Sequence, residues 1–353
     1  MYNIVRAQEL LAHGVHSRIV RGAVDCCLLR LTPGMYSIIG RCQDPRHACI
    51  AGMITDEEWI RRVAAQRADA QQRDYGFDEV VEKLKIASYP RYREDDVVCG
   101  ISAARIHDLP LYRVGAKRIH IASPSHRLRT AVVNRTTRDV PETDRVRIGK
   151  MQLTSPARTS LELIPQIGEP GAFVAMEAVL RRSVFGEDEH TAGRFGYPPD
   201  TCELARQAVE SLFVPVLERL PTGQQRASRL VGSIGALSES YAESRCSYNL
   251  IVLGIRDFEQ QVQVLEKGRS IARVDFMDRA SKTILFVDGA GKYTETGGKV
   301  LQKEATQFNR LVALGYRIVR FTFAEVMDLE AFATKLFGQA PWLRGRVRRN
   351  RSV

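Results

Sequence analysis

Residues 270–293 read SIARVDFMDRASKTILFVDGAGKY, and this stretch decides the fold that the sequence predicts. It holds two short apolar segments, SIARVDFM and KTILFVD, each with the length and composition of a β-strand. The segment EQQVQVLE (259–266), just before them, alternates polar and apolar residues and predicts a third strand. We therefore expect three consecutive strands in the C-terminal third of the chain.

Helices are predicted on both sides of these strands. One covers about 237–253, and a second covers 299–314, after the loop GAGKYTETGG. The strand YRIVRFT and a helix over 324–337 follow. The order helix, three strands, helix, strand predicts a three-layer α/β unit built on a mixed sheet. The second helix has an apolar stripe at helical spacing, formed by Leu301, Ala305, Phe308 and Val312.

Three acidic residues and a lysine of this unit are candidates for a catalytic site. Asp275 lies inside an apolar strand, Asp288 ends the next strand, and Lys292 follows four residues later. Glu243 comes from the first helix. Strand-end carboxylates and a helix glutamate are suitable ligands for one or two Mg²⁺ ions, and a lysine beside them stabilises developing charge. The set is typical of metal-assisted phosphodiester hydrolysis, with Asp275 and Asp288 as the metal ligands.

The same residues also have a structural interpretation. Asp-Gly is a common turn dipeptide, so Asp288 can simply begin the loop after its strand. Glu243 can be a solvated helix residue. His107, in a short predicted helix with apolar neighbours, is more typical of a packed, hydrogen-bonded side chain than of a catalytic one. Spacing alone leaves both interpretations of the acidic set open.

Residues 3–40 predict a winged helix-turn-helix. The segment RAQELLAHG has apolar residues at helical spacing and ends at a glycine, a second helix begins near His16, and LLRLTPGMYSII reads as strand, turn and strand. We expect Arg18 and Arg21 on the outer face of the second helix, where a recognition helix meets the major groove, and Arg30 on the wing. The alternative is a small helical cap with solvated arginines.

Net charge favours a polyanionic partner. The chain carries a formal net charge of +11, and five arginines in its last sixteen residues supply +5 of it. A tail of that composition is also compatible with a solvated, disordered segment. Double-stranded DNA is the partner that the charge and the predicted winged helix favour together.

Length and pattern predict several domains. At 353 residues the chain is long enough for two or three, and its fold class is predicted as multi-domain α/β. The predicted segments are a winged helix, a helical connector, an α+β middle region, the α/β unit described above and an Arg-rich tail. Their ranges are 1–40, 41–96, 97–232, 233–340 and 341–353.

The cysteines and the apolar runs bear on the compartment. Seven cysteines without a C-x-x-C pair fit no disulfide framework, so reduced structural thiols are the interpretation we favour over metal binding by Cys42, His47 and Cys49. The longest apolar run, NLIVLGI, is too short for a membrane helix, and the N-terminus does not read as a signal peptide. We expect a cytoplasmic protein that does not contact a membrane.

The segment from about Glu239 to Leu336 resembles the PD-(D/E)XK, very-short-patch-repair-like endonuclease domain. The similarity is carried by the order of SESYAESR, QQVQV, RVDF, VDGAGKY and LGYRIVRFT. GISAARIHDLP and LTSPARTSLEL, further upstream, are similar to the middle region of proteins that join this domain to a winged helix of the AbiEi antitoxin type. The resemblance implies a restriction-endonuclease-like fold, an Mg²⁺ cofactor, DNA as partner and, for the antitoxin, a cognate toxin protein.

Carried over by residue, the resemblance implies roles for the acidic set. Asp275 matches the first metal-ligand aspartate, Asp288 the aspartate of the E-x-D-G motif, Lys292 the motif's basic ending and Glu243 the helix glutamate. Phe286 departs from the motif, because a glutamate is expected there. Residues 286 and 288 share one face of a strand, so a phenyl ring replaces a carboxylate in the expected metal pocket.

Two functions follow from the sequence. The first is a DNA-binding protein whose C-terminal domain is an Mg²⁺-dependent endonuclease, a hydrolase acting on phosphodiesters. The second is a non-catalytic, antitoxin-like transcriptional regulator with a degenerate nuclease domain, which Phe286 favours. A small-molecule enzyme is disfavoured, because the chain has no P-loop, no G-x-G-x-x-G after a strand and no G-x-S-x-G elbow.

Overall fold

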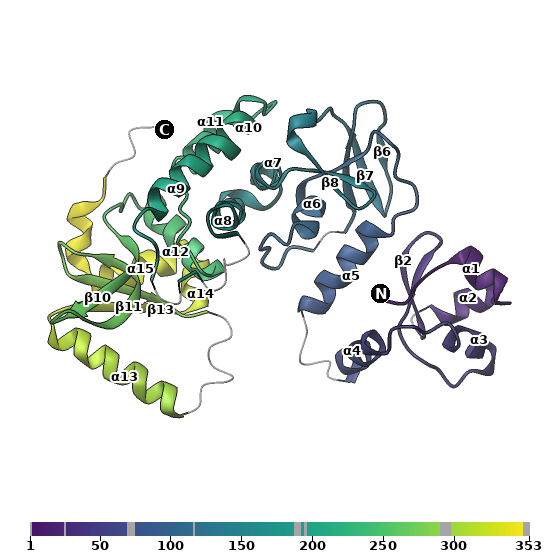
Figure 1. Cartoon of the computed structure of the whole chain (residues 1–353), viewed down its shortest axis with the longest axis horizontal. Helices are drawn as coiled ribbons and strands as arrows, with labels where there is room; N and C mark the ends of the chain where they lie inside the picture. The colour runs from purple at the N-terminus through teal and green to yellow at the C-terminus, as the bar shows by residue number, and fades with distance from the viewer. Residues whose placement is uncertain are drawn as a thin grey trace. The chain divides into compact units, whose positions relative to one another are not determined.

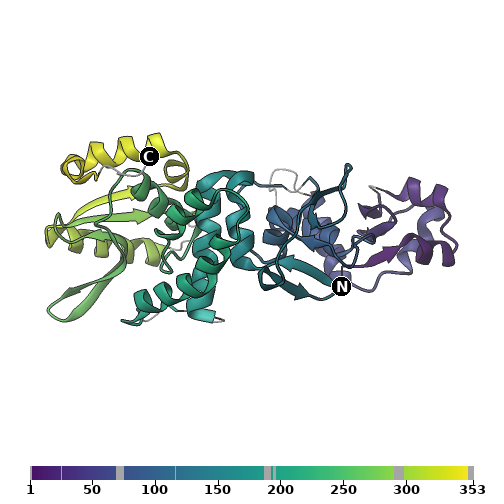
Figure 2. The same cartoon turned by 90° about the horizontal axis from the view of Figure 1, so that it is seen from above.

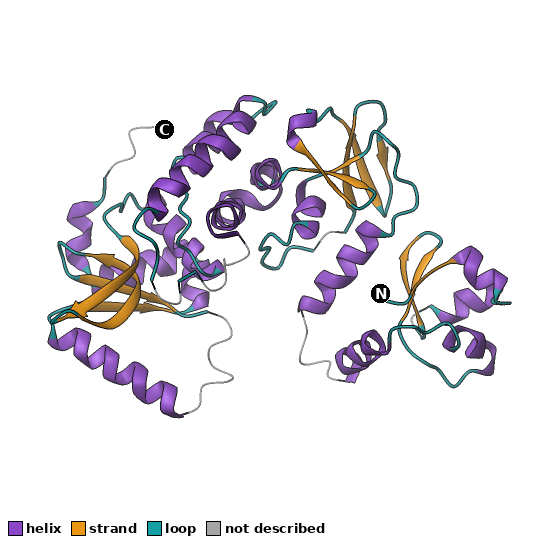
Figure 3. Ribbon diagram, in the orientation of Figure 1, coloured by secondary structure: helices purple, strands orange, loops and turns teal. Residues whose placement is uncertain are grey.

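The computed structural model describes residues 2–24, 26–68, 75–115, 117–186, 192–193, 196–289 and 298–348. The fold is mixed α/β and contains three sheets (Figure 3). In the described parts, no helix has both the length and the apolar character needed to cross a membrane.

The chain divides into two compact units. Unit 1 comprises Met1–Asp108 and Arg113–Ser155, and unit 2 comprises Leu109–Tyr112 and Pro156–Val353. The division after Ser155 falls inside the middle segment that the sequence predicts, and the winged-helix and connector segments both belong to unit 1.

Unit 1 begins with two short helices and a small sheet. Helices α1 (Ala7–Ala12) and α2 (Ser17–Ala23) and the hairpin β2 (Leu28–Thr32) and β3 (Met35–Ile38) occur where the sequence predicts them. An additional strand, β1 (Ile4–Arg6), pairs with β3, so the sheet order is β1-β3-β2 and all pairs are antiparallel. Figure 2 shows α1 and α2 beside these strands. Their shared core is formed by Val5, Leu10, Val15, Val20, Ala23, Cys27, Leu28, Ile38 and Ile50.

The predicted helical connector packs against this hairpin. It comprises η1 (Pro45–His47), α3 (Ala48–Ala51), α4 (Glu57–Ala68) and α5 (Tyr75–Ala87). A second buried cluster joins α4 and α5 to the strands, because Trp59 stacks on Phe77 and its indole N–H donates to Ser37 Oγ at 2.9 Å. The connector therefore shares a hydrophobic core with the N-terminal elements.

The rest of unit 1 is a six-stranded mixed sheet of order β6-β7-β5-β4-β9-β8. Helix α6 (Gly100–Ile106) packs against it, and a buried ion pair joins Arg135 of the sheet to Asp96 just before it. The strands are β4 (Val97–Val98), β5 (Ile119–Ser123), β6 (Leu128–Arg129), β7 (Val133–Thr137), β8 (Arg145–Ile148) and β9 (Met151–Thr154), with η2 (Glu142–Asp144) before β8.

Unit 2 opens with a helical layer. Its longest helix, α8, bends at Gly168, whose φ of +81° is in the left-handed region that glycine adopts without strain. A π-helical turn, η4, joins two of the later helices, α9 and α10. The helical elements are α7 (Pro156–Glu162), α8 (Ile164–Phe185), α9 (Thr201–Ala208), η4 (Val209–Phe213), α10 (Val214–Glu218) and α11 (Gln224–Val231).

The C-terminal part of unit 2 has the predicted element order and a mixed sheet. The strand order is β10-β11-β12-β13, antiparallel except for the parallel β12–β13 pair. Figure 1 shows α13 along one face of this sheet and α12, α14 and α15 on the other side. The elements are α12 (Tyr241–Val252), β10 (Glu259–Glu266), β11 (Arg269–Asp278), β12 (Thr283–Val287), α13 (Gly298–Ala313), β13 (Arg317–Phe321), α14 (Phe323–Met327), α15 (Leu329–Gln339) and η5 (Pro341–Arg346).

Helix α13 does not bury its predicted apolar stripe. Phe308 is 42% exposed and Val312 49% exposed, whereas Leu311 is fully buried against the sheet. Ala305 is exposed too, and the side chain of Leu301 lies outside the described residues. Helical spacing identifies a face but not the layer it meets, and the sheet here contacts the neighbouring face around Leu311.

The beginning of the Arg-rich tail is packed on unit 2. Leu343 is fully buried, and the Trp342 indole donates to Thr283 Oγ1 at 3.0 Å. Arg346 pairs with Asp278 at 2.7 Å and Arg348 with Asp257 at 2.6 Å. Of the alternatives that the sequence leaves open for the tail, the solvated one does not hold as far as residue 348, because apolar anchors and carboxylates of the same unit hold it.

Candidate functional site

The predicted acidic site lies where β10 and β11 are distorted. Gln261 has a φ of +55°, a left-handed conformation that non-glycine residues seldom adopt. Gln260 pairs with Phe276 and Val262 with Val274, but the Gln261–Asp275 pair between them is missing from the ladder. Strained backbone of this kind is concentrated at functional sites, so the distortion favours a functional role for this part of the sheet.

The distortion changes which face of the sheet the side chains reach. Val274 packs in the cluster on the α13 side, whereas Phe276 packs with α12, α14 and α15. In a regular strand residues i and i+2 share a face, so the alternation shifts by one residue at Asp275. The carboxylate of Asp275 lies within electrostatic range of Glu243 and Cys246 on α12.

Glu243 is almost fully buried at the start of α12. The Ser240 side chain caps the helix by accepting from Glu243 N, and the Ser240 hydroxyl donates to Glu243 Oε1 at 2.8 Å. The second oxygen, Oε2, accepts from the Glu239 backbone N–H at 2.9 Å and from Gln261 Nε2 at 2.8 Å. Three donors from the cap and from β10 thus hold this carboxyl group in one orientation.

Burial first, and then the charge of Asp275, raise the pKa of Glu243 to about 7. The thiol of Cys246, one turn along the helix, has a pKa well above its ordinary value for the same two reasons, burial first and then Asp275. A carboxyl group with a pKa near neutrality suits proton transfer. Glu243 and Asp275 are therefore one electrostatically linked pair, as the sequence predicts for two residues of a site.

Asp275 lies where β11 and β12 part. Their pairing ends at Phe276 and Leu285, and beyond that point Asp275 Oδ2 accepts from the Val287 backbone N–H at 2.8 Å. Continuing the register places Phe286 opposite Asp275. Phe286 packs with the apolar cluster on the α13 side, which explains why this position carries a phenyl ring.

Asp288 is held by a cation of the protein itself. Asp288 is 4% exposed. Its two carboxylate oxygens accept from Arg320 Nε at 3.0 and 2.9 Å, and Arg320 Nη2 lies 2.8 Å from Oδ1. Arg320 comes from β13, in register with Phe286. Asp288 thus begins the loop after its strand with both oxygens bound to a guanidinium group.

The carboxylates fit magnesium only in part. Glu243 and Asp275 offer hard oxygen ligands with mutually unfavourable charge, which a divalent cation would relieve. Asp288 does not fit, because Arg320 already takes its oxygens. Among the described residues, Glu243, Asp275 and Asp288 form no group of three with all ligand atoms within 4.8 Å. Lys292 lies outside the described residues.

A buried acid that the sequence did not single out, Glu177 of α8, extends this acidic region. It accepts from the Gly235 backbone N–H at 3.0 Å and from the Ser238 hydroxyl at 2.7 Å. Burial above all, with a smaller contribution from the charge of Glu243, raises its pKa to about 7. A glutamate inside the apolar run AFVAMEAVL was the available signal, because such residues are rarely buried without partners.

The predicted DNA-contacting arginines lie on the elements expected for them. Arg18 and Arg21 are exposed on α2, and Arg30 is exposed on β2. Arg30 also lines a hollow of about 310 Å³ within unit 1, together with Lys85, Lys117 and Arg118. Glu82 is the one acidic residue among the residues that line it. This side of the hairpin is therefore strongly basic.

His107 is engaged structurally, because its Nε2 lies 2.8 Å from the Thr154 carbonyl oxygen.

Comparison of the chain with protein-family models, with curated proteins and with solved structures finds no match.

Proposed function

We propose that this chain is a DNA-binding protein that contacts duplex DNA through a winged helix-turn-helix at its N-terminus. The observation that carries the proposal is the exposed pair Arg18 and Arg21 on α2, the second of two short helices that precede a β-hairpin. In winged helices this second helix enters the major groove and the hairpin contacts the backbone. Arg30 and the basic hollow beside it suit phosphate contacts.

The C-terminal part of unit 2 is proposed to have an endonuclease-like fold, and we favour its non-catalytic form. Arg320 donates to both carboxylate oxygens of Asp288, and Phe286 lies where the resemblance leads us to expect a ligand glutamate. Both features replace metal ligation by contacts within the protein. The chain is then an antitoxin-like regulator, and a cognate toxin is the protein partner that the resemblance implies.

Mg²⁺-dependent phosphodiester hydrolysis is the second candidate. It is favoured by the strained Gln261 and by the linked pair Glu243 and Asp275. Asp275 would hold the ion, whose chemistry would be to activate water and to neutralise phosphate charge. Glu243, with a pKa of about 7, would serve as a general base rather than as a ligand.

DNA binding is tested by measuring the affinity of the full chain for duplex DNA as a function of salt. The double variant Arg18→Ala/Arg21→Ala removes two cations from the face of α2. If both contact phosphates, the slope of log K against log salt decreases by about two. The matched control is Arg41→Ala/Arg61→Ala, which removes the same charge from exposed positions beside Glu57. Equal slopes for the two double variants would contradict a recognition role for α2.

Cleavage is tested by nicking of supercoiled plasmid in Mg²⁺, in Mn²⁺ and in EDTA. The favoured function predicts the same plasmid topology in all three. Metal-dependent nicking that is lost in Asp275→Asn and kept in the surface control Glu259→Gln would establish the second candidate instead. Nicking retained in Asp275→Asn would indicate a contaminant, and DNA binding is scored separately in the first experiment.

A further inference from the structure

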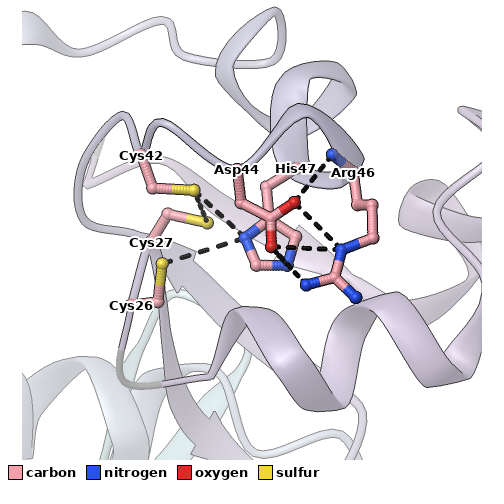
Figure 4. Close-up of polar contacts among 6 residues, drawn as sticks. All are labelled: Cys26, Cys27, Cys42, Asp44, Arg46 and His47. Atoms are coloured by element: carbon pink, nitrogen blue, oxygen red, sulfur yellow. Dashed lines mark hydrogen bonds and ion pairs between the residues drawn. The ribbon is translucent and has the colours of Figure 1, made fainter.

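Three cysteines and a histidine meet in unit 1. Cys26, Cys27, Cys42 and His47 direct their Sγ atoms and one ring nitrogen to a common point, and these four atoms all lie within 4.8 Å of one another (Figure 4). Cys42 Sγ is 3.9 Å from Cys27 Sγ and 3.0 Å from His47 Nδ1, and Cys26 Sγ is 3.8 Å from the same nitrogen. Among the described residues this is the only such group.

The separations are close to those of a tetrahedral zinc site. With Zn–S near 2.3 Å and Zn–N near 2.0 Å, two sulfur ligands lie about 3.8 Å apart and a sulfur and a nitrogen about 3.5 Å apart. The Cys27–Cys42 and Cys26–His47 distances lie within about 0.3 Å of these values. Cys42 and His47, at 3.0 Å, would separate by about half an ångström, and all the ligand atoms lie within 4.8 Å of one another.

We propose that Cys26, Cys27, Cys42 and His47 bind one Zn²⁺ ion as a structural Cys₃His site. Four protein ligands close the tetrahedron, which is the arrangement of structural rather than catalytic zinc. Thiolate sulfur selects zinc over magnesium and calcium, which take oxygen ligands.

The second ring nitrogen of His47 supports this assignment. Nε2 faces Asp44, with Oδ2 3.9 Å away, so Nδ1 is left to face the sulfur atoms. Zinc-bound histidines commonly direct their other N–H towards a carboxylate, which orients the ring. Arg46 fixes Asp44 in turn, because its backbone N–H and guanidinium both donate to that carboxylate (Figure 4).

The closeness of the three thiols points the same way. As thiolates, sulfur atoms within 4.8 Å of one another would repel, and a divalent cation at their centre reverses that interaction.

The ligands join two segments that lie far apart in the sequence. Cys26 and Cys27 follow the last turn of α2, and Cys42 and His47 lie in the segment after β3. The 3₁₀ turn Pro45–His47, capped by Asp44, brings the His47 ring towards Cys42. Arg67 of α4 donates to the carbonyl oxygen of Cys26 at 2.9 Å and holds the turn from the other side. The ion would therefore fasten the end of α2 to the connector.

Metal content of the purified full chain tests the proposal. The chain is produced in zinc-supplemented medium, kept reduced, freed of loose metal and analysed by inductively coupled plasma mass spectrometry. We expect about one zinc per chain, and about one in Cys49→Ser, but less than about a fifth in Cys42→Ser and in His47→Gln. Cys49 is the matched control, because it is exposed and outside the group although it lies two residues from His47.

Cobalt titration of the metal-free wild-type chain provides a measurement that needs no variant. Co²⁺ bound by three thiolates gives strong ligand-field bands and a sulfur-to-cobalt charge-transfer band, which Zn²⁺ then abolishes. If Cys42→Ser fails to fold, Cys26→Ser is measured in its place, because the Cys26 side chain is half-exposed. A zinc-free chain without cobalt bands, a disulfide between Cys27 and Cys42, or equal zinc loss in Cys49→Ser and Cys42→Ser would each overturn the proposal.

Discussion

The two groups of candidate metal ligands in this protein differ in what their ligand atoms contact. In unit 1, three thiols and an imidazole converge on one point within 4.8 Å. In unit 2, each predicted carboxylate is already bound: Asp288 by Arg320, Glu243 by three donors and Asp275 by the Val287 N–H. The ligand atoms of the first group face one another, whereas the carboxylates of the second accept hydrogen bonds from donors of the protein.

This difference shows that residue type and spacing do not by themselves make a metal site. Carboxylates at strand ends are good ligands, yet a single arginine on the next strand, Arg320, takes the place of an ion. The adjacent pair Cys26 and Cys27 matches no common spacing, yet the turn after α2 brings both sulfur atoms to His47. Convergence of ligand atoms is the property that separates the two regions.

The largest expected effect is that of metal removal from unit 1. Chelation under reducing conditions removes a ligand that binds the folded state, which costs about 4 kcal/mol if zinc is present at a thousand times its dissociation constant. For a unit the size of unit 1 the melting temperature of the affected transition then falls by roughly 8–16 °C. Calorimetry of the full chain with and without chelator measures it. An equal fall in melting temperature on chelation of wild type and of Cys42→Ser would show that the stability of unit 1 does not depend on metal bound by Cys42.

The second effect is the pH dependence of the acidic region in unit 2. Because the pKa of Glu177 is raised to about 7 from 4.5, its contribution to stability is full below pH 4.5 and is lost as pH rises towards 7. The difference in unfolding free energy between Glu177→Gln and wild type should shift by about 3 kcal/mol in favour of the variant as pH rises from 4.5 to 8. Urea unfolding at several pH values measures this. The exposed Glu218→Gln is the control and should show no such trend.

A smaller effect is expected from removing the arginine that holds Asp288. Arg320→Gln leaves a buried carboxylate with fewer donors, and because Arg320 is half-exposed the cost is about 1–2 kcal/mol. The freed carboxylate should now respond to Mg²⁺. We expect 10 mM Mg²⁺ to raise the melting temperature of the variant by roughly 2 °C, which corresponds to an ion concentration near its dissociation constant. An equal rise in wild type would show that Arg320 does not exclude the ion.

The smallest effect is that of Cys49→Ser. The side chain is exposed and lies outside the Cys/His group, so the unfolding free energy should stay within about 0.5 kcal/mol of wild type. Thermal unfolding of this variant beside Cys26→Ser measures the contrast. A larger loss in Cys49→Ser than in Cys26→Ser would mean that the ligand set of unit 1 has been assigned incorrectly.

The predictions made from local pattern were largely accurate for individual elements. The two N-terminal helices, the hairpin and the α-β-β-β-α-β order occur where the sequence predicts them, because turn residues and short-range periodicity encode single elements. The apolar stripe of α13 is not its buried face, because Phe308 and Val312 are exposed. β1 was missed, because a three-residue strand has too little pattern of its own.

Contacts between distant residues were beyond the reach of the sequence. The slip of alternation at Asp275 depends on Gln261 across the ladder, fourteen positions away, whose φ no local pattern predicts. Cys42, His47 and Cys49 were weighed as a metal set from proximity in sequence, but the structure places Cys26 and Cys27 with Cys42 and His47 instead. Proximity along the chain is a weak guide to proximity in space.

The sequence by itself determined the mixed α/β class, the order of the elements and the basic face of α2, since each depends on composition, turn chemistry and periodicity within about twenty residues. Only the tertiary structure decided which ligands meet. The protonation and the hydrogen-bond partners of a side chain depend on neighbours from other segments. Arg320 of β13 pairs with Asp288, and Cys27 lies beside Cys42. Burial and convergence are properties of the packed chain, and these two properties distinguish the two groups of candidate ligands.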